Sequence, residues 1–278
     1  MKSGKKKISK GRIVLCIIAV FLMLLWLFPY YYLVLQSIVP WTEVDKRVLT
    51  TEFSLDSYRY LFGGNGAADP FQWVRALLNS FLVSVPTAVI TIVVGLLTGY
   101  AAVHMRYKGK GFIHSSLLFQ MFFPVVVLLV PRYMIVSPLA NRYLGMILPL
   151  SVSIWGVFMY MNYFRTVPPA VFEAAKIDGA GPFRIYWSVV LPDIRPAIGS
   201  IGIFTAMMQW NDYLNPLLML NDMEKMTMPL GLVIFNSQRT SDLSATMAAA
   251  TMIMMPMIII FVMFQKQFIK GMTMSGIK

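Results

Sequence analysis

Long apolar segments dominate this 278-residue sequence and limit the folds open to it. Six of them approach the roughly 20 residues that an α-helix needs to cross the hydrocarbon core of a bilayer. They lie at residues 13–35, 80–103, 113–136, 144–164, 197–220 and 246–268. A spanning segment must satisfy its backbone hydrogen bonds internally, and continuous apolar runs do not fit the alternation of a β-barrel. The sequence therefore predicts an all-α, polytopic membrane protein with six transmembrane helices.

The first apolar segment follows a lysine-rich start and could be mistaken for a signal peptide. Its apolar run is about twice as long as the core of a signal peptide, and no small-residue cleavage site follows it. Aromatic residues at 28–32 follow instead, as in the interfacial belt of a retained span. We therefore expect residues 1–12 to form a tail and residues 13–278 to form a single transmembrane domain.

The charged residues, only 13% of the chain, collect between the apolar segments rather than on a solvated face. This placement argues against nucleic-acid binding in spite of a formal net charge of +12. With the N-terminus inside the cell, the inner segments hold sixteen Lys and Arg against three acidic residues, whereas the outer segments hold eight of each; Lys266 and Arg132, near span ends, are counted with the adjacent inner and outer segments. The positive-inside rule therefore predicts that both termini face the cytoplasm.

Residues 165–196 form a long inner loop with clear helix signals. Thr166 followed by Pro168-Pro169 is typical of a helix start, because proline fits the first turn, where amide donors are unpaired. Gly179 is expected to end this helix, since glycine readily adopts a left-handed conformation. A second helical stretch is expected to follow and to end near Pro192. The loop is thus predicted to be a short helix–turn–helix at the inner membrane surface.

The first helix of this loop has a face that suits docking onto another protein. Four residues share that face by their i, i+3, i+4 and i+7 spacing: Val171, Ala174, Ala175 and Asp178. Alanines allow close approach, and a carboxylate such as Glu173 can pair with an arginine in a groove of the partner. The alternative is an amphipathic helix that rests on lipid, but such helices are usually rich in Lys and Arg, whereas this face is acidic.

The string EAAKIDGAGPFRIYWSVVLP at residues 173–192 closely resembles the EAA signature of binding-protein-dependent ABC importer permeases. Further segments are similar to the smaller, six-span subunit of maltose-type carbohydrate transporters: Asn79-Ser80, GYAA at 99–102, WNDY at 210–213 and the ending at 265–271. The resemblance implies a type I ABC importer permease in a bacterial plasma membrane. In such a fold, residues 165–196 are the cytoplasmic coupling loop.

The resemblance also implies partners and a mechanism. The partners are a second homologous permease subunit that completes a heterodimer, a dimer of a cytoplasmic ABC ATPase that uses ATP and Mg, an extracellular solute-binding protein, and a sugar as cargo. Closure of the ATPase dimer would swing the spans between inward-open and outward-open states. The residues implied to dock on the ATPase are Glu173, Ala174, Ala175, Asp178, Gly179 and Ala180.

The chain itself carries no visible catalytic motif. A glycine-rich phosphate loop ending in Lys-Ser or Lys-Thr is absent from the sequence, so ATP hydrolysis is expected to belong to a partner and this chain is not expected to be an enzyme. No nucleophile–base pair or metal-ligand cluster stands out, so we expect no catalytic residue, metal or cofactor here. His104 and His114 have no partner at metal-ligand spacing and are expected to be interfacial loop residues.

Two other segments are candidates for contact with the cargo or the binding protein. In the fifth span, hydrogen-bonding groups and aromatic faces suited to a sugar come together at Trp210, Asn211, Asp212 and Tyr213. The alternative for this run is a helix-end cap flanked by aromatic belt residues. In the outer segment 221–245, the resemblance suggests contacts with the binding protein at Asn236, Ser237, Gln238 and Asp242.

There are alternatives for the cargo and for the class of transporter. Within ABC importers, a polyamine, phosphate or amino-acid permease is the alternative, and the resemblance at 210–213 and 265–268 favours an oligosaccharide. A secondary transporter is the alternative of another class, but it would usually show broken, charge-bearing central helices rather than an acidic, alanine-faced loop. The resemblance implies that selectivity for the sugar resides largely in the separate binding protein.

Overall fold

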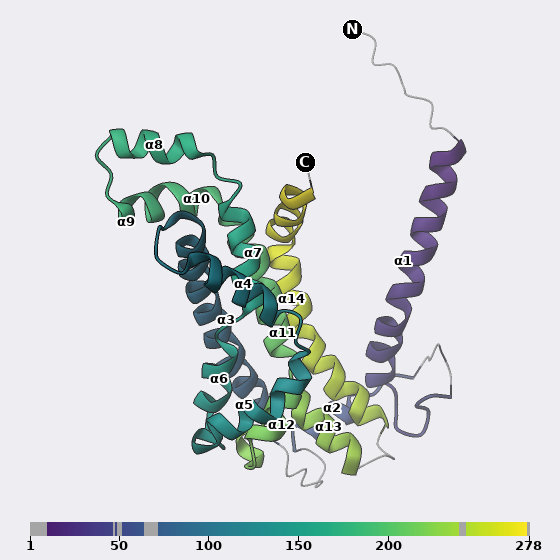
Figure 1. The fold of residues 1–278 in the computed structure, drawn as a ribbon. Coiled ribbons are helices and arrows are strands. Elements are labelled where there is room, and N and C mark those ends of the chain that lie inside the picture. Colours follow the sequence, from purple (N-terminus) through teal and green to yellow (C-terminus); the bar gives the residue numbers. More distant parts are fainter. Residues whose placement is uncertain (1–9, 47, 49–51, 64–71, 239–242, 277–278) are drawn as a thin grey trace. The chain divides into compact units, whose positions relative to one another are not determined.

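The computed structural model describes residues 10–46, 48, 52–63, 72–238 and 243–276, and all regular structure in these ranges is helical. Four helical segments are long and apolar enough to cross a membrane (Figure 1). They are α1 (Lys10–Ser37), α3 (Trp73–His104), the Tyr143–Phe164 segment and the Leu243–Lys266 part of α14 (Leu243–Gly276). The expected all-α membrane fold is therefore confirmed.

The third expected span, 113–136, is not one continuous helix. It consists of α4 (Lys110–Gln120) and the Val125–Leu139 segment, which meet at 101°. Pro124 stands at the break in an extended conformation, with φ −60° and ψ 126°. Proline has no amide hydrogen and disfavours helical backbone in the preceding residue, so the helix ends before it.

The fifth expected span, 197–220, also differs from a single helix. Helix α11 (Arg195–Trp210) ends ten residues early, and α12 (Leu214–Met219) follows after a short break. Before α11, the Pro182–Asp193 segment meets it at 76°. The number of spans rises from four to six if each bent pair is counted as one span, so the count of six stays a prediction.

The remaining helices are short. They are α2 (Asp56–Leu61), η1 (Val125–Leu128), α5 (Leu129–Val136), η2 (Ser137–Leu139), α6 (Tyr143–Leu150), α7 (Ile154–Phe164), α8 (Pro169–Ile177), α9 (Pro182–Ile185), η3 (Tyr186–Val190), α10 (Leu191–Asp193), η4 (Met223–Lys225) and α13 (Met228–Gln238). Helix η3 is a π-helical turn, whereas the other η segments are 3-10 helices.

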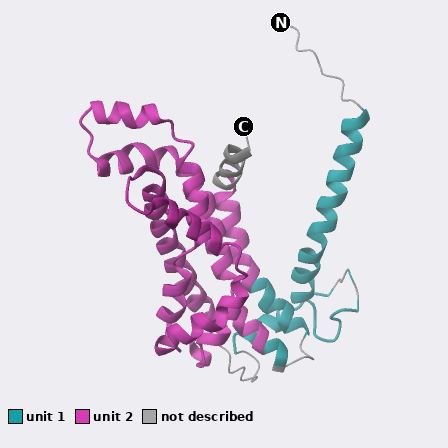
Figure 2. Ribbon diagram, viewed as in Figure 1, with its two compact units in different colours: residues 1–70, 235–252 teal, residues 71–234, 253–278 magenta. Residues whose placement is uncertain are grey.

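The chain divides into two compact units, coloured separately in Figure 2. Unit 1 comprises residues 1–70 and 235–252, and unit 2 comprises residues 71–234 and 253–278. In unit 1, the hydroxyl groups of Ser57 and Ser244 lie 2.5 Å apart, which joins α2 to the start of α14. The Ser244 hydroxyl also lies within hydrogen-bonding distance of the Val39 carbonyl. Unit 2 holds the coupling loop, residues 210–213 and the Asn79-Ser80 pair.

The frame of unit 2 is the packing of α3 against α7. Gly95 and Gly99 form a GxxxG pattern, which lets two membrane helices approach closely. A Cβ atom added at Gly95 would lie 2.9 Å from the Tyr160 ring, and one added at Gly99 would lie 3.3 Å from the Met161 amide nitrogen. The glycines are therefore required by the closeness of the two helices.

Candidate functional site

The coupling loop, residues 165–196, begins as the sequence predicts. The Thr166 hydroxyl donates a hydrogen bond of 2.7 Å to the Tyr163 carbonyl, which turns the chain at the end of α7. Val167 is buried, and Pro168 then serves as the N-cap of α8. Pro169 occupies the first turn, where its missing amide hydrogen leaves no helical bond unmade.

Helix α8 ends in a Schellman motif centred on Gly179. This glycine has φ of +74°, the left-handed conformation that the sequence predicts for it. Its amide donates to the Lys176 carbonyl, and the Ala180 amide donates to the Ala175 carbonyl, both at 3.0 Å. These two bonds satisfy carbonyl groups that the helix end would otherwise leave unpaired.

The structure separates the two alanines that the sequence placed on one face. Glu173, Ala174 and Asp178 are exposed, whereas Ala175 is only 9% exposed and packs into the interior. Consecutive helical residues lie about 100° apart around the axis, so neighbouring alanines can face different environments. Gly179 is exposed and Ala180 is half-buried. Helix α8 therefore presents Glu173, Ala174 and Asp178 to solvent. Its Ala175 packs against the interior of unit 2.

The second arm of the loop is the helical segment Pro182–Asp193. It contains the π-helical turn η3, in which the Leu191 amide donates to the Tyr186 carbonyl. Pro192 cannot donate the usual bond to Ser188, which favours this wider turn one residue earlier. The arm continues to Asp193, slightly beyond the end expected from Pro192. In Figure 1, α8 and the α9–α10 arm form a hairpin at one end of unit 2.

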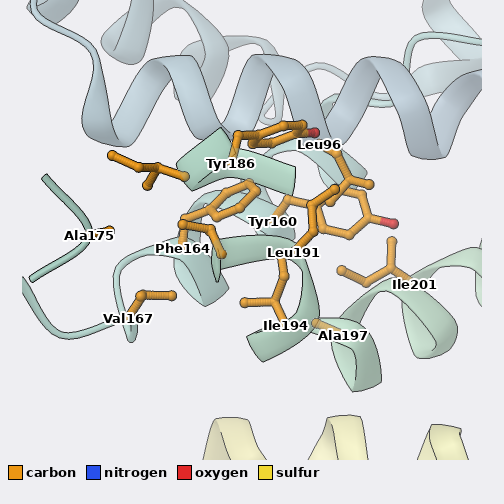
Figure 3. Close-up of a cluster of buried hydrophobic side chains, with 12 residues drawn as sticks. Leu96, Tyr160, Phe164, Val167, Ala175, Tyr186, Leu191, Ile194, Ala197 and Ile201 are labelled. Atoms are coloured by element: carbon orange, nitrogen blue, oxygen red, sulfur yellow. The ribbon is translucent and has the colours of Figure 1, made fainter. Parts of the chain in front are cut away.

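A cluster of buried hydrophobic side chains fixes this hairpin to the membrane helices (Figure 3). Its members come from α3, α7, both arms of the loop and α11. They are Leu96, Tyr160, Phe164, Val167, Ala175, Ile185, Tyr186, Val190, Leu191, Ile194, Ala197 and Ile201. The hairpin is thus a packed extension of the helices rather than a loosely attached loop.

Aromatic rings extend this attachment to the end of α3. The His104 ring lies 4.3 Å from the Phe172 ring of α8, measured between centroids. His104 Nε2 is also 3.2 Å from the Phe164 carbonyl oxygen. Tyr100, one turn earlier, lies 4.8 Å from Tyr186 of the second arm. The expectation that His104 is an interfacial loop residue is therefore wrong: it is the last residue of α3 and contacts α8.

The sequence did not identify this aromatic contact, although Tyr100 and His104 have the i, i+4 spacing of one helix face. Their partner rings lie 60 to 90 residues further along the chain, so no local pattern links them. His114, the other histidine, lies within α4 and not in a loop. Among the described residues, no group of three His, Cys, Asp or Glu side chains could hold a metal ion.

The residues at 210–213 divide into buried and exposed members. Trp210 is buried and donates a hydrogen bond of 3.1 Å from Nε1 to the Ile253 carbonyl. Asp212 Oδ1 accepts from the amides of Leu214 and Asn215, at 3.1 and 3.2 Å, and so caps the start of α12. Asn211 and Tyr213 are exposed. Asp212 thus forms a helix cap, which was the alternative interpretation of residues 210–213.

The residues expected to contact a binding protein lie at the end of α13. Asn236 and Ser237 are exposed. Gln238 is the last residue of the helix, and its side chain lies outside the described part of the chain, as does all of Asp242.

Comparisons with known proteins agree with the resemblance in the sequence. A model of the family described as "Binding-protein-dependent transport system inner membrane component" matches residues 61–274. The arabinooligosaccharides transport permease AraQ of Bacillus subtilis is 32% identical over 97% of both chains. The sn-glycerol-3-phosphate transport permease UgpE of Brucella suis is 29% identical over 88% of this chain and 89% of its own.

A solved structure shares the fold. One chain of a bacterial ABC transporter involved in import of the acidic polysaccharide alginate superposes with a TM-score of 0.79. The match covers 95% of this chain and all of that chain, at 20% sequence identity. The family match at residues 61–274 includes the coupling loop, residues 165–196. The chain therefore belongs to the inner membrane components of binding-protein-dependent ABC transport systems.

Proposed function

We propose that this permease imports a sugar or oligosaccharide and is driven by a separate cytoplasmic ATPase that docks on α8. The observation that carries the proposal is the exposure of Glu173 and Ala174 on a helix whose opposite side is fixed to the membrane helices. A force applied to α8 would therefore reach α3, α7 and α11 rather than be lost in a flexible loop. Such an arrangement suits a coupling element between an ATPase and a pore.

The docking contact is proposed to be a charge-assisted hydrogen bond. The Glu173 carboxylate would accept from an arginine of the ATPase, because such pairs are stronger than neutral hydrogen bonds. Ala174 and Gly179 have no bulky side chain and would let the groove close on the helix. The positive-inside distribution of Lys and Arg supports a cytoplasmic location for this loop and both termini.

The remaining partners are proposed because the family and the resemblance support them. A second homologous permease would complete the pore as a heterodimer. A solute-binding protein would deliver the cargo at the opposite side of the membrane. A related alginate importer has been solved in complex with its periplasmic protein.

The relatives' names support a carbohydrate as cargo. They include permeases for arabinooligosaccharides and a probable permease for starch degradation products from Thermoanaerobacterium thermosulfurigenes, which is 27% identical. The sn-glycerol-3-phosphate permeases favour a second candidate, a small phosphorylated polyol. Exposed Asn211 and Tyr213 are proposed to line the path, while Asp212 and Trp210 hold them in place.

The proposal is tested with the reconstituted complex of the two permeases, the ATPase and the binding protein. Glu173→Lys should abolish transport-coupled ATP hydrolysis, because it places like charges together in the groove, while the permease stays folded. Asp193→Lys is the matched control, since Asp193 is an exposed acidic residue of the same loop outside the docking set. Retained coupled hydrolysis in the Glu173 variant would refute the docking assignment.

The same complex identifies the cargo class. Oligosaccharides, sn-glycerol-3-phosphate, a polyamine and an amino acid are each supplied to the binding protein, and stimulation of ATP hydrolysis is measured. Stimulation by an oligosaccharide alone supports the main proposal, and stimulation by one of the others replaces it. Uptake that persists without ATP would point instead to a secondary transporter.

A further inference from the structure

The pair Asn79-Ser80 is similar to a segment of the maltose-type permeases, but it has no role in the proposed function. In the structure it belongs to a buried polar network. Asn79 is 5% exposed and Ser80 is 1% exposed, both in the second turn of α3. Polar side chains buried this deeply are costly unless they are hydrogen-bonded. Their partners therefore show what the pair is for.

Asn79 uses both ends of its amide. Its Nδ2 donates to two backbone carbonyl oxygens, those of Glu224 at 2.8 Å and Met226 at 3.0 Å. Its Oδ1 accepts a hydrogen bond of 2.8 Å from the Tyr143 hydroxyl at the start of α6. One side chain thus joins α3 to the first turn of α6 and to the 223–227 segment that leads into α13.

Ser80 holds the next residue of the same segment. Its Oγ accepts a hydrogen bond of 2.8 Å from the amide of Met228, the first residue of α13. The first amides of a helix have no partner within the helix, and a side-chain oxygen that accepts from one of them acts as an N-cap. Here the cap comes from a different helix, so it fixes where α13 starts relative to α3.

A weaker set of contacts surrounds this buried pair. Arg75 Nη2 lies 2.9 Å from Glu224 Oε2, with both side chains largely exposed. Asp222 accepts from Asn141 Nδ2 at 2.6 Å and from Lys225 Nζ at 2.8 Å. Exposed ion pairs contribute little to stability, so the buried amide and hydroxyl carry the geometry of the segment.

We propose that Asn79 and Ser80 are positioning residues that set the start of α13 for engagement of the binding protein. The inference rests on the proposed function and on the expectation from the sequence that the 221–245 segment meets the binding protein. Directional hydrogen bonds fix the segment in one arrangement before the partner arrives, and such preorganisation lowers the cost of binding. Asparagine suits the position because its amide offers two donors and an acceptor at once.

The test compares Ser80→Ala with Ser84→Ala. Ser84 lies one turn further along α3, is 3% exposed, and its Oγ has no hydrogen-bond partner among the described residues. The two variants therefore remove the same buried hydroxyl, with and without a bond to α13. In the reconstituted complex, ATP hydrolysis is measured as the concentration of the binding protein is varied.

Ser80→Ala should raise the half-saturating concentration of the binding protein about tenfold, the effect of one buried donor left unpaired. Asn79→Asp should have a larger effect, because it removes two donors and points a negative charge at two carbonyls, and Tyr143→Phe a smaller one. Basal ATP hydrolysis and copurification with the ATPase should remain as in the wild type. Ser84→Ala should match the wild type throughout.

Several outcomes would overturn the proposal. One is an unchanged half-saturating concentration in Ser80→Ala, and another is a loss of basal hydrolysis in parallel with stimulation, which indicates a merely structural role. If the wild type itself shows no stimulation, the proposed function fails. The hydrogen-bonding claim is then still decided by hydrogen exchange, which should be faster at the Met228 amide in Ser80→Ala than in Ser84→Ala.

Discussion

The two ends of α3 each hold a segment that leaves the helical bundle, but they do so with different chemistry. At one end, His104 and Tyr100 contact the coupling loop through ring packing. At the other end, Asn79 and Ser80 contact the 223–228 segment through three hydrogen bonds. The same helix thus supports one segment by apolar surface and the other by directional polar contacts.

This difference suits different mechanical roles. Apolar packing is non-directional, so rings can shift against one another and remain in contact. A hydrogen bond weakens steeply when its angle changes, so a network of them specifies one arrangement. We expect the His104 end of α3 to transmit movement of α8, and the Asn79 end to stay fixed in both states of the transport cycle.

Gly99→Val should have the largest effect, because it disrupts the packing of α3 against α7 near His104. The added side chain has no space there. Even a Cβ would lie 3.1 Å from Tyr160 Cβ and 3.3 Å from a backbone nitrogen, which cannot move aside. Overpacking of this kind typically costs about 1–3 kcal/mol, occasionally more. We expect a lower unfolding temperature and a smaller yield of monodisperse permease in detergent.

Gly111→Val is the matched control for that variant. Gly111 is also within a helix, and a Cβ there would meet no atom within 4 Å. Its unfolding temperature should stay close to that of the wild type. Equal losses in both variants would mean that the change in helix propensity, not the α3–α7 contact, causes the effect.

Phe172→Ala should have a smaller effect on folding and a specific effect on coupling. Phe172 of α8 is half-buried, and its ring lies against that of His104. We therefore expect a loss of stability of about 2 kcal/mol, below the range for a fully buried phenylalanine. Because the ring links α8 to α3, the number of sugar molecules transported per ATP hydrolysed should fall. Phe172→Leu, which keeps an apolar contact, should restore part of this ratio.

The exposed ring of Phe112 on α4 provides the comparison. Phe112→Ala removes the same atoms from a side chain that is 79% exposed, and it should leave the transport ratio unchanged. His104→Phe keeps a ring but loses the contact with the Phe164 carbonyl, so its effect should lie between those of the two alanine variants. An unchanged ratio in Phe172→Ala would show that α8 acts through the second arm of the loop alone.

The sequence predicted the parts of this fold that depend on local patterns. Apolar runs located the membrane helices, and Pro169 and Gly179 set the ends of α8, because helix ends follow from backbone constraints of single residues. The breaks at Pro124 and Asn211 were missed, since hydropathy measures apolar length and not continuity of the helix. Pro124 was an available signal for the first break, although α3 continues through Pro86 without a break.

Contacts between distant segments could not be predicted in this way. Asn79 was noticed only by resemblance, and its partners Glu224 and Met226 lie 145 and 147 residues away in the sequence. The separate orientations of Ala174 and Ala175 likewise depend on where the buried hydrophobic cluster lies, which no periodicity within the loop specifies. Docking faces of short helices therefore need the tertiary structure.

The smallest expected effect is a pH dependence of stability that arises at the Asn79 end of α3. It tests whether the exposed charges or the buried amide hold the 223–228 segment. The hydrogen bond from Lys225, followed by that from Asn141, lowers the pKa of Asp222 below its ordinary 3.8. A carboxyl group with a lowered pKa in the folded state stabilises the protein above its unfolded pKa and loses this contribution as the pH falls through the folded value.

The unfolding temperatures of the wild type and Asp222→Asn should therefore differ slightly at pH 7 and converge below about pH 4. Asp222 is exposed, so salt should also reduce the difference. The hydrogen bonds of Asn79 and Ser80 are neutral and buried, and the effect of Ser80→Ala should not change with salt. A large pH dependence that also removed the Ser80 effect would mean that the charges around Asp222, and not the buried pair, position α13.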